Sequence, residues 1–182
     1  MEWILAAAVA GLAIWAVLIY NRLVTKRNRV NTAWSDIDVQ LTLRHDLVPN
    51  LVDVVQAYVG HERKTLEEVT ALRAQAVQTD SPAELGRIEN DLEQLLGRLL
   101  VLEESYPDLK ASTNFSDLSA RLVDVENQLG YARRYYNGAV RDLNTLIGQF
   151  PDLIIARLFR FQEAEFYSAE AGHRPAPEIG PL

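Results

Sequence analysis

The chain contains no cysteine and only three histidines among its 182 residues. The missing cysteine excludes disulfides, thiolate zinc sites, iron–sulfur clusters and thiol catalysis. Positive charge is also scarce, because 18 Lys and Arg stand against 25 Asp and Glu, a formal net charge of −7 at pH 7. Nucleic-acid binding needs an electropositive surface, so no nucleic-acid partner is expected. Hydrophobic residues still make up 48% of the chain, which is enough for a folded core.

The sequence also lacks catalytic and metal-binding patterns. His45 and His61 belong to no Glu-x-x-His or His-Glu-x-x-His pattern, and His173 lies near the C-terminus. No Gly-x-Ser-x-Gly turn, Gly-rich phosphate loop or kinase-like motif occurs. We therefore predict no catalytic, metal or cofactor-binding residues and no enzymatic activity. A hydrolase with an unrecognised carboxylate site is the least favoured alternative.

One long hydrophobic run is present, and it begins near the N-terminus. Trp3 to Tyr20 reads WILAAAVAGLAIWAVLIY and carries no charge. At a helical rise of about 1.5 Å per residue it spans about 27 Å, close to the hydrocarbon thickness of a bilayer. Residues 1–24 are therefore predicted to be a transmembrane anchor. A cleaved signal peptide is the alternative, but it would have basic residues before the run, where only Glu2 stands.

Basic residues follow the hydrophobic run rather than precede it, and this order predicts the orientation of the anchor. Positive charge stays on the cytoplasmic side, so the N-terminus should lie outside the membrane, with residues 25–170 forming a cytoplasmic helical bundle. Membrane lipid is an expected partner of this apolar run. Small residues four apart in the run favour helix association, so further copies of the chain are expected partners as well. The basic residues are Arg22, Lys26, Arg27 and Arg29, and the small pairs are Ala6/Ala10 and Ala7/Gly11.

The apolar pattern after the anchor is helical, with no stretch that alternates like a strand. Neither Gly nor Pro occurs between Gly11 and Pro49, so the anchor helix should continue unbroken into the bundle. Pro49 should bend this helix rather than end it, because the heptad seam keeps its register across the proline. The predicted seam is Val30, Trp34, Ile37, Leu41, Arg44, Val48, Leu51, Val55, Tyr58, Glu62, Thr65, Val69, Leu72 and Ala76.

Two further long helices are predicted, each doubling back on the one before. Ser81-Pro82-Ala83-Glu84 reads as a capping box with proline at the first helical position, and residues 103–113 read as a loop. Asn114 or Ser116 should cap the next helix. The two seams are Leu85, Ile88, Leu92, Leu95, Leu99, Leu102, and then Leu118, Leu122, Val125, Leu129, Ala132, Tyr136, Ala139, Leu143, Leu146, Phe150.

Pro151 should end the last long helix, and Asp152 should cap a shorter helix after it. That helix is predicted to bear Leu153, Ile154, Leu158, Phe161 and Phe166. Residues 171–182 are rich in Pro and Gly and are predicted to be a disordered tail.

Charged residues inside the seams need partners, because a buried unpaired charge costs several kcal/mol. Arg44 and Glu62 occupy such positions. We predict a clasp in which Arg44 pairs with Glu126 and Arg133 pairs with an acid of the first helix such as Asp36. The alternative is that these long side chains lie along the seam with their charged ends in water. Asn137 and Asn144 flank the last long seam on its other side.

Two groups of residues follow an order that resembles the LemA family of bacterial membrane proteins. The first comprises Asn31, Asp36-Ile37, Gln40-Leu41, Arg44, Asp46-Leu47-Val48-Pro49-Asn50-Leu51-Val52, Tyr58, His61-Glu62 and Arg73. The second comprises Glu126-Asn127, Ala132-Arg133, Tyr136-Asn137, Val140, Asn144, Phe150-Pro151, Ile154 and Ala156. The resemblance covers residues 1–167 and implies an all-helical cytoplasmic bundle behind one transmembrane helix whose N-terminus lies outside. It carries over no catalytic residue.

The sequence thus predicts an all-α, LemA-like protein whose single N-terminal transmembrane helix continues into a long-helix antiparallel bundle. The leading functional prediction is a non-enzymatic scaffold or assembly factor of the bacterial inner membrane. The alternative is an accessory or sensor subunit of a membrane protease or envelope-stress system. This alternative follows from the resemblance, because LemA family members often occur beside membrane metalloproteases or other envelope-stress proteins. A magnetosome protein is also similar to the family.

Overall fold

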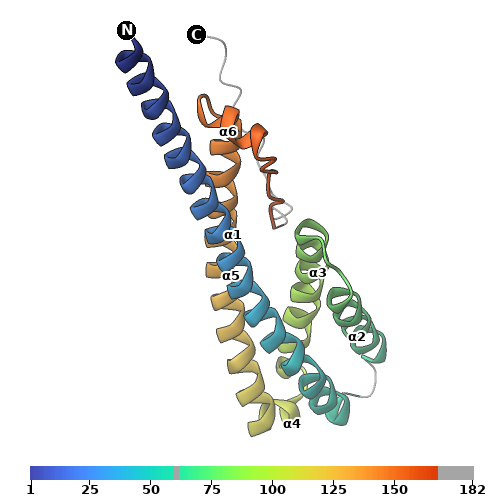
Figure 1. The fold of residues 1–182 in the computed structure, drawn as a ribbon. Coiled ribbons are helices and arrows are strands. Elements are labelled where there is room, and N and C mark those ends of the chain that lie inside the picture. The colour runs from blue at the N-terminus through green and yellow to red at the C-terminus, as the bar shows by residue number, and fades with distance from the viewer. Residues whose placement is uncertain (60–61, 168–182) are drawn as a thin grey trace, which may run out of the picture. The chain divides into compact units, whose positions relative to one another are not determined.

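The computed structural model describes residues 1–59 and 62–167, and every regular element in that part of the chain is a helix (Figure 1). The predicted all-α class is therefore confirmed, whereas the predicted tail at residues 171–182 lies outside the described residues. The elements are α1 Glu2–Tyr58, α2 Arg63–Val77, α3 Pro82–Val101, the 3₁₀ helix η1 Leu102–Glu104, α4 Pro107–Lys110, α5 Thr113–Gly148 and α6 Asp152–Leu158.

These helices build two compact units, to both of which α1 and α5 contribute. Unit 1 comprises Met1–Asp46 and Arg121–Glu165, and unit 2 comprises Leu47–Ala120 and the chain from Phe166 onward. In unit 1 the first part of α1 runs antiparallel to α5, because Lys26 contacts Asp142 whereas Arg44 contacts Glu126. Residue numbers thus rise along one helix as they fall along the other.

The hydrophobic seams supply most of the core of unit 1. Ile37 and Leu41 of α1 are buried, as are Leu129 and Leu143 of α5. Phe150, the last residue of the predicted α5 seam, is instead 77% exposed, so its assignment to the core was wrong. It follows the end of α5 at Gly148 and therefore no longer keeps the helical register.

Helix α1 passes Pro49 without ending, as predicted, but it does not reach Ala76. It ends at Tyr58, and α2 is a separate helix that begins at Arg63. Gly60 stands in the sequence between them, and glycine costs about 1 kcal/mol in a helix relative to alanine. Tyr58, the last residue of α1, is exposed and Val59 directly after it is buried, so the assignment of Tyr58 to the core was wrong.

In unit 2, α2 and α3 form the predicted antiparallel pair. The Ser81 hydroxyl accepts a hydrogen bond from the backbone N–H of Glu84 at 3.4 Å, and Pro82 is the first residue of α3, so the predicted capping box is confirmed. Leu85, Leu92, Leu95 and Leu99 are buried, whereas Ile88 and Leu102 of the same predicted seam are half-buried.

The segment predicted as a loop at residues 103–113 is partly helical. It holds most of η1 and all of α4, a single turn with Pro107 at its first position. Helix α5 then begins at Thr113, and the Ser112 hydroxyl accepts a hydrogen bond from the N–H of Phe115 at 3.4 Å. The cap is therefore Ser112 rather than Asn114 or Ser116, because α5 begins two residues before the start that a cap at Asn114 would give.

The prediction of a short helix after Pro151 is confirmed by α6, whereas its cap and its length were predicted wrongly. Pro151, not Asp152, stands at the N-cap position, and Phe161 and Phe166 lie beyond the helix end at Leu158. Ile155 and Ala156 are buried, whereas Ile154 and Leu158 are exposed. Seven residues make barely two turns, so apolar spacing alone does not identify the buried side.

The burial of α5 yields a test of the seam. Leu129 is fully buried and Gln128 beside it is exposed. Leu129→Ala should therefore lower the free energy of unfolding by about 2–5 kcal/mol, because it removes buried methyl groups and leaves a cavity. Gln128→Ala should change it by less than about 0.5 kcal/mol. Chemical denaturation of the detergent-solubilised chain measures both, and equal losses would contradict the assignment of the seam.

Candidate membrane-anchoring site

The N-terminal part of α1 is apolar and uncovered. From Trp3 to Tyr20 nearly every side chain is exposed, with Ala16 half-buried and Ile19 buried. The core helix of a soluble protein can be equally long and apolar, but its apolar side chains are covered by the rest of the fold. The part of the chain that the structure describes has one helix long and apolar enough to cross a membrane, and it is α1.

The basic residues after the apolar run contact the rest of unit 1. Lys26 Nζ lies 2.6 Å from Asp142 Oδ2 on α5, and Arg22 Nη1 lies 3.9 Å from Asp152 Oδ1 on α6. The hydrogen bond from Lys26, together with its charge, holds the pKa of Asp142 below its ordinary value. Asp152 is itself buried, so Arg22 provides a countercharge at the point where α6 begins.

The other two cations contact aromatic rings. The guanidinium of Arg27 lies 5.3 Å from the ring centroid of Phe161. Arg29 Nε donates a hydrogen bond to the Tyr135 hydroxyl at 3.0 Å, and its guanidinium lies 5.2 Å from the same ring. The four cations whose position predicted the orientation of the anchor therefore also contact the folded part of unit 1.

The predicted pairing of Arg44 with Glu126 is present. Arg44 is fully buried, and its Nη2 donates to Glu126 Oε2 at 2.9 Å. The Glu126 side chain keeps 24% of its surface exposed, so the pair lies at the edge of the core with its cation on the inner side. The alternative in which Arg44 extends into water is excluded. The second predicted pair, Arg133 with Asp36, stays a prediction.

The segment after α6 returns along α5 and is held by side chains whose partners sequence analysis did not foresee. Asn144 donates from Nδ2 to the Ala164 carbonyl at 2.9 Å and accepts from the Ala164 N–H at 2.8 Å. The Tyr136 hydroxyl donates to the Glu165 carbonyl at 2.8 Å. Burial, with a smaller contribution from the charge of Glu165, raises the pKa of Tyr136. An extended segment has no periodicity, so only the polar Asn144 beside the apolar seam hinted at it.

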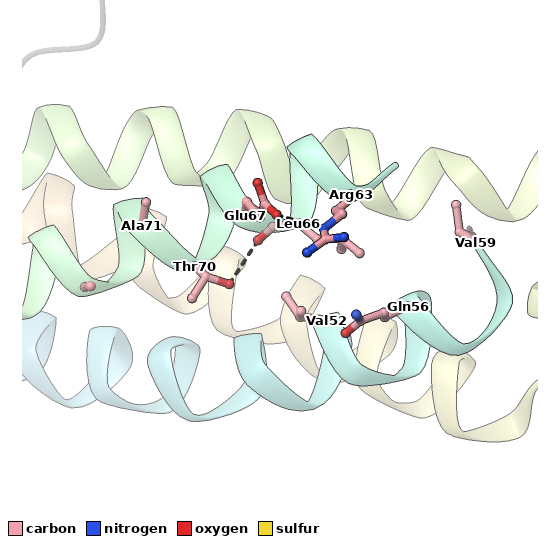
Figure 2. A pocket seen from close by; sticks show the side chains of 9 residues that line it. Val52, Gln56, Val59, Arg63, Leu66, Glu67, Thr70 and Ala71 are labelled. Carbon is pink, nitrogen blue, oxygen red and sulfur yellow. Dashed lines mark hydrogen bonds and ion pairs between the residues drawn. The ribbon is translucent and has the colours of Figure 1, made fainter. Parts of the chain in front are cut away.

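Unit 2 has an open groove of about 740 Å³ between the end of α1 and α2 (Figure 2). Val52 and Leu66 supply apolar walls. The polar groups on the α2 side bond to one another, because Arg63 Nε donates to Glu67 Oε1 at 3.0 Å and the Thr70 hydroxyl donates to the Leu66 carbonyl at 2.9 Å. The groove can therefore take an apolar group without leaving these donors unsatisfied.

The histidines do not assemble a metal site within the described residues. No three His, Asp or Glu side chains gather there in a way that could hold a metal ion. His45 is half-buried on α1, whereas His61 and His173 lie outside the described part of the chain. Glu62, the other charge predicted in the first seam, is half-buried before α2 and accepts a hydrogen bond from the Thr65 hydroxyl at 3.4 Å.

A sequence model of the LemA family matches residues 33–180, which is most of the chain. The chain belongs to the LemA family. The resemblance seen in the sequence is thereby confirmed, and its most specific segment, Leu47 to Val52, lies on α1 with Val48 and Leu51 buried.

Curated relatives of this LemA-family chain include proteins with two kinds of name. It is 23% identical to "Magnetosome protein MamQ" of Magnetospirillum gryphiswaldense, over 88% of this chain and 70% of the relative. It is 23% identical to "Magnetosome protein MamQ 2" of Paramagnetospirillum magneticum, over 86% and 67%. It is 26% identical to "Protein LemA" of Metamycoplasma hominis, over 82% and 69%. None of these names denotes an enzyme.

The burial of the Arg44–Glu126 pair predicts that the loss of either partner is costly. Glu126→Gln removes the countercharge of a fully buried guanidinium and should lower the free energy of unfolding by about 3–5 kcal/mol. Arg44→Met fills similar space but leaves the Glu126 carboxylate, whose Oε1 is buried, without its cation, so it should also cost about 3–5 kcal/mol. The double variant should lose clearly less than the sum. A double-mutant cycle on the detergent-solubilised chain measures this, and additive losses would show that the two side chains do not interact.

Proposed function

We propose that this LemA-family protein is a non-enzymatic, membrane-anchored scaffold or assembly factor of the bacterial inner membrane. One observation carries the proposal: α1 continues without interruption from an uncovered apolar segment into the folded units. The helix has no flexible joint at the membrane surface, and the cations there contact α5, α6 and the segment after α6. Such an anchor holds the folded part in a defined position against the bilayer, which suits assembly of other proteins better than turnover of a substrate.

The names of the relatives support this proposal. The MamQ proteins are named for the magnetosome, a cellular structure, and not for a reaction. The exposed small residues of the anchor support self-association, since Gly11 has open space where a side chain would stand. Close approach of helices in lipid depends on such positions.

The groove of unit 2 favours a second candidate, an accessory or sensor subunit of a membrane protease or envelope-stress system. An open, partly apolar groove of about 740 Å³ is large enough to accept side chains from a partner. The groove is formed by α2 and the end of α1, so it belongs to the folded part and not to the anchor.

The mass of the assembly extracted from native membranes distinguishes the two candidates. Native mass spectrometry should show a uniform homo-oligomer if the chain is a scaffold, and a stoichiometric complex with a protease if it is an accessory subunit. In the second case Ala71→Trp, which fills the groove, should release the protease. Ala57→Trp, on an exposed position of α1 outside the groove, is the matched control and should leave the complex intact. A monomer without partners would contradict both candidates.

The orientation proposed for the anchor, with its N-terminus outside, makes a separate prediction. Alkaline phosphatase fused after Leu182 should be inactive, and a fluorescent protein at the same place should fold, because both would lie in the cytoplasm. Replacing the cations of residues 22–29 with Gln should scramble the orientation, since positive charge close to the span resists translocation. The same change at Arg87, Arg98, Lys110 and Arg121, far along the chain, should not. A strongly active phosphatase fusion in the unaltered chain would reverse the proposed topology.

A further inference from the structure

Helix α6 is apolar on the side that it buries and also on the side that it exposes. Ile155 and Ala156 are buried in unit 1. On the opposite side, Ile154 is 51% and Leu158 is 70% exposed. A short surface helix normally places polar residues on its outer face, so this pattern indicates that the outer face does not meet bulk water.

Two aromatic residues extend the exposed apolar face of α6 at either end. Phe150, before the helix, is 77% exposed, and Phe159, directly after it, is 54% exposed. We call Phe150, Ile154, Leu158 and Phe159 the corner patch, because they surround the turn from α5 into α6 and the end of α6. Four large apolar side chains exposed within residues 150–159 indicate an interaction surface, because a soluble protein normally exposes such residues singly.

The corner patch lies beside the end of the membrane-spanning segment. The rings of Phe159 and Tyr20 are 4.7 Å apart between centroids, and Arg22 lies 3.9 Å from Asp152 at the start of α6. Figure 1 shows α6 next to the N-terminal half of α1, within unit 1. Tyr20 ends the uncharged run and Arg22 is the first cation after it, so this is the level at which hydrocarbon gives way to lipid headgroups.

The charges around the corner patch also suit a lipid surface. Arg157 and Arg160 are exposed beside its apolar residues, and their side chains can reach lipid phosphates. The acid within α6, Asp152, is buried beside Arg22, whereas Glu163 and Glu165 follow farther along the chain. Exposed apolar and aromatic residues next to exposed cations are the composition of an interfacial membrane helix.

We propose that the corner patch inserts into the interfacial region of the leaflet that faces the folded part of unit 1. Helix α6 is then a second membrane contact, which lies in the interface beside the helix that spans the bilayer. Lipid is the occupant that the structure favours, because the patch is continuous with the apolar surface of α1 that lipid must already cover. The inference rests on the proposed membrane anchor, and its test must separate the two.

The absence of cysteine from the chain allows a spin label to be placed at one position at a time. We would label four full-length variants, Ile154→Cys, Leu158→Cys, Leu12→Cys and Val123→Cys, in vesicles of equimolar phosphatidylcholine and phosphatidylglycerol. Leu12 is exposed in the middle of the anchor and reports the span. Val123 is an exposed apolar residue about 37 Å along α5 from Gly148, and serves as the matched control outside the membrane. Circular dichroism confirms that each variant remains helical.

Collision with oxygen, which concentrates in lipid, and with a water-soluble nickel chelate then gives the depth of each label. We expect labels at residues 154 and 158 to favour oxygen several-fold over the chelate relative to residue 123, and to lie shallower than residue 12. The proposal is overturned if the α6 labels meet the chelate as often as residue 123 does while residue 12 lies deep. Exclusion of both reagents from α6 would show that protein covers the patch, and would overturn it as well. If residue 12 itself meets the chelate freely, the anchor and the corner-patch contact both fail.

Discussion

Helix α1 carries two different kinds of surface on one uninterrupted backbone. Its first part exposes nearly all of its apolar side chains, whereas from Leu23 onward it buries one stripe and exposes the rest. A helix satisfies its backbone hydrogen bonds internally, so the same conformation serves in hydrocarbon and in water. The remainder of unit 1 depends on this continuity, because α5 and α6 contact the same helix that carries the uncovered apolar segment.

The basic residues that follow the apolar run of α1 predict its orientation in a membrane and also contact the rest of unit 1. In water a surface ion pair such as Lys26–Asp142 contributes about 0–1 kcal/mol, so these contacts do not hold unit 1 together by themselves. Their number and position matter more, since Arg22, Lys26, Arg27 and Arg29 each contact α5, α6 or the segment after α6. Together these contacts hold residues 22–29 of α1 against α5, α6 and the segment after α6.

Much of the fold was predictable because the spacing of apolar residues and the residues at helix caps identify helices in a sequence. The seams of α1, α3 and α5, the Ser81 cap and the pairing of Arg44 with Glu126 all followed from residue order. The failures have a common cause, which is that they lie where periodicity stops. The predicted first seam continues past the end of α1 at Tyr58, and α6 is too short for its spacing to identify its buried face.

The candidate site was predicted only in part, because its remaining contacts join a periodic helix to an extended segment. Asn144 pairs with the backbone of Ala164, and Tyr136 donates to the carbonyl of Glu165. Nearly every residue carries the same backbone N–H and C=O groups, so the sequence does not indicate that Ala164 and Glu165 are the partners of these side chains. The exposure of Phe150 was missed for a related reason, since its spacing matches the seam but the helix ends at Gly148.

The Arg44–Glu126 pair gives the two long helices a unique register. The seam of α5 is apolar along most of its length, so a slip of one heptad would still place apolar residues opposite apolar residues. Such a slip would move Glu126 away from Arg44 and bring Arg133 or Ser119 to its place, which leaves a buried cation beside a like charge or a hydroxyl. Breaking a buried pair in this way costs about 3–5 kcal/mol. The slip would also carry α6 about 10 Å along α1, which separates Phe159 from Tyr20. The Arg44–Glu126 pair at the edge of the core therefore fixes the position of α6 along α1.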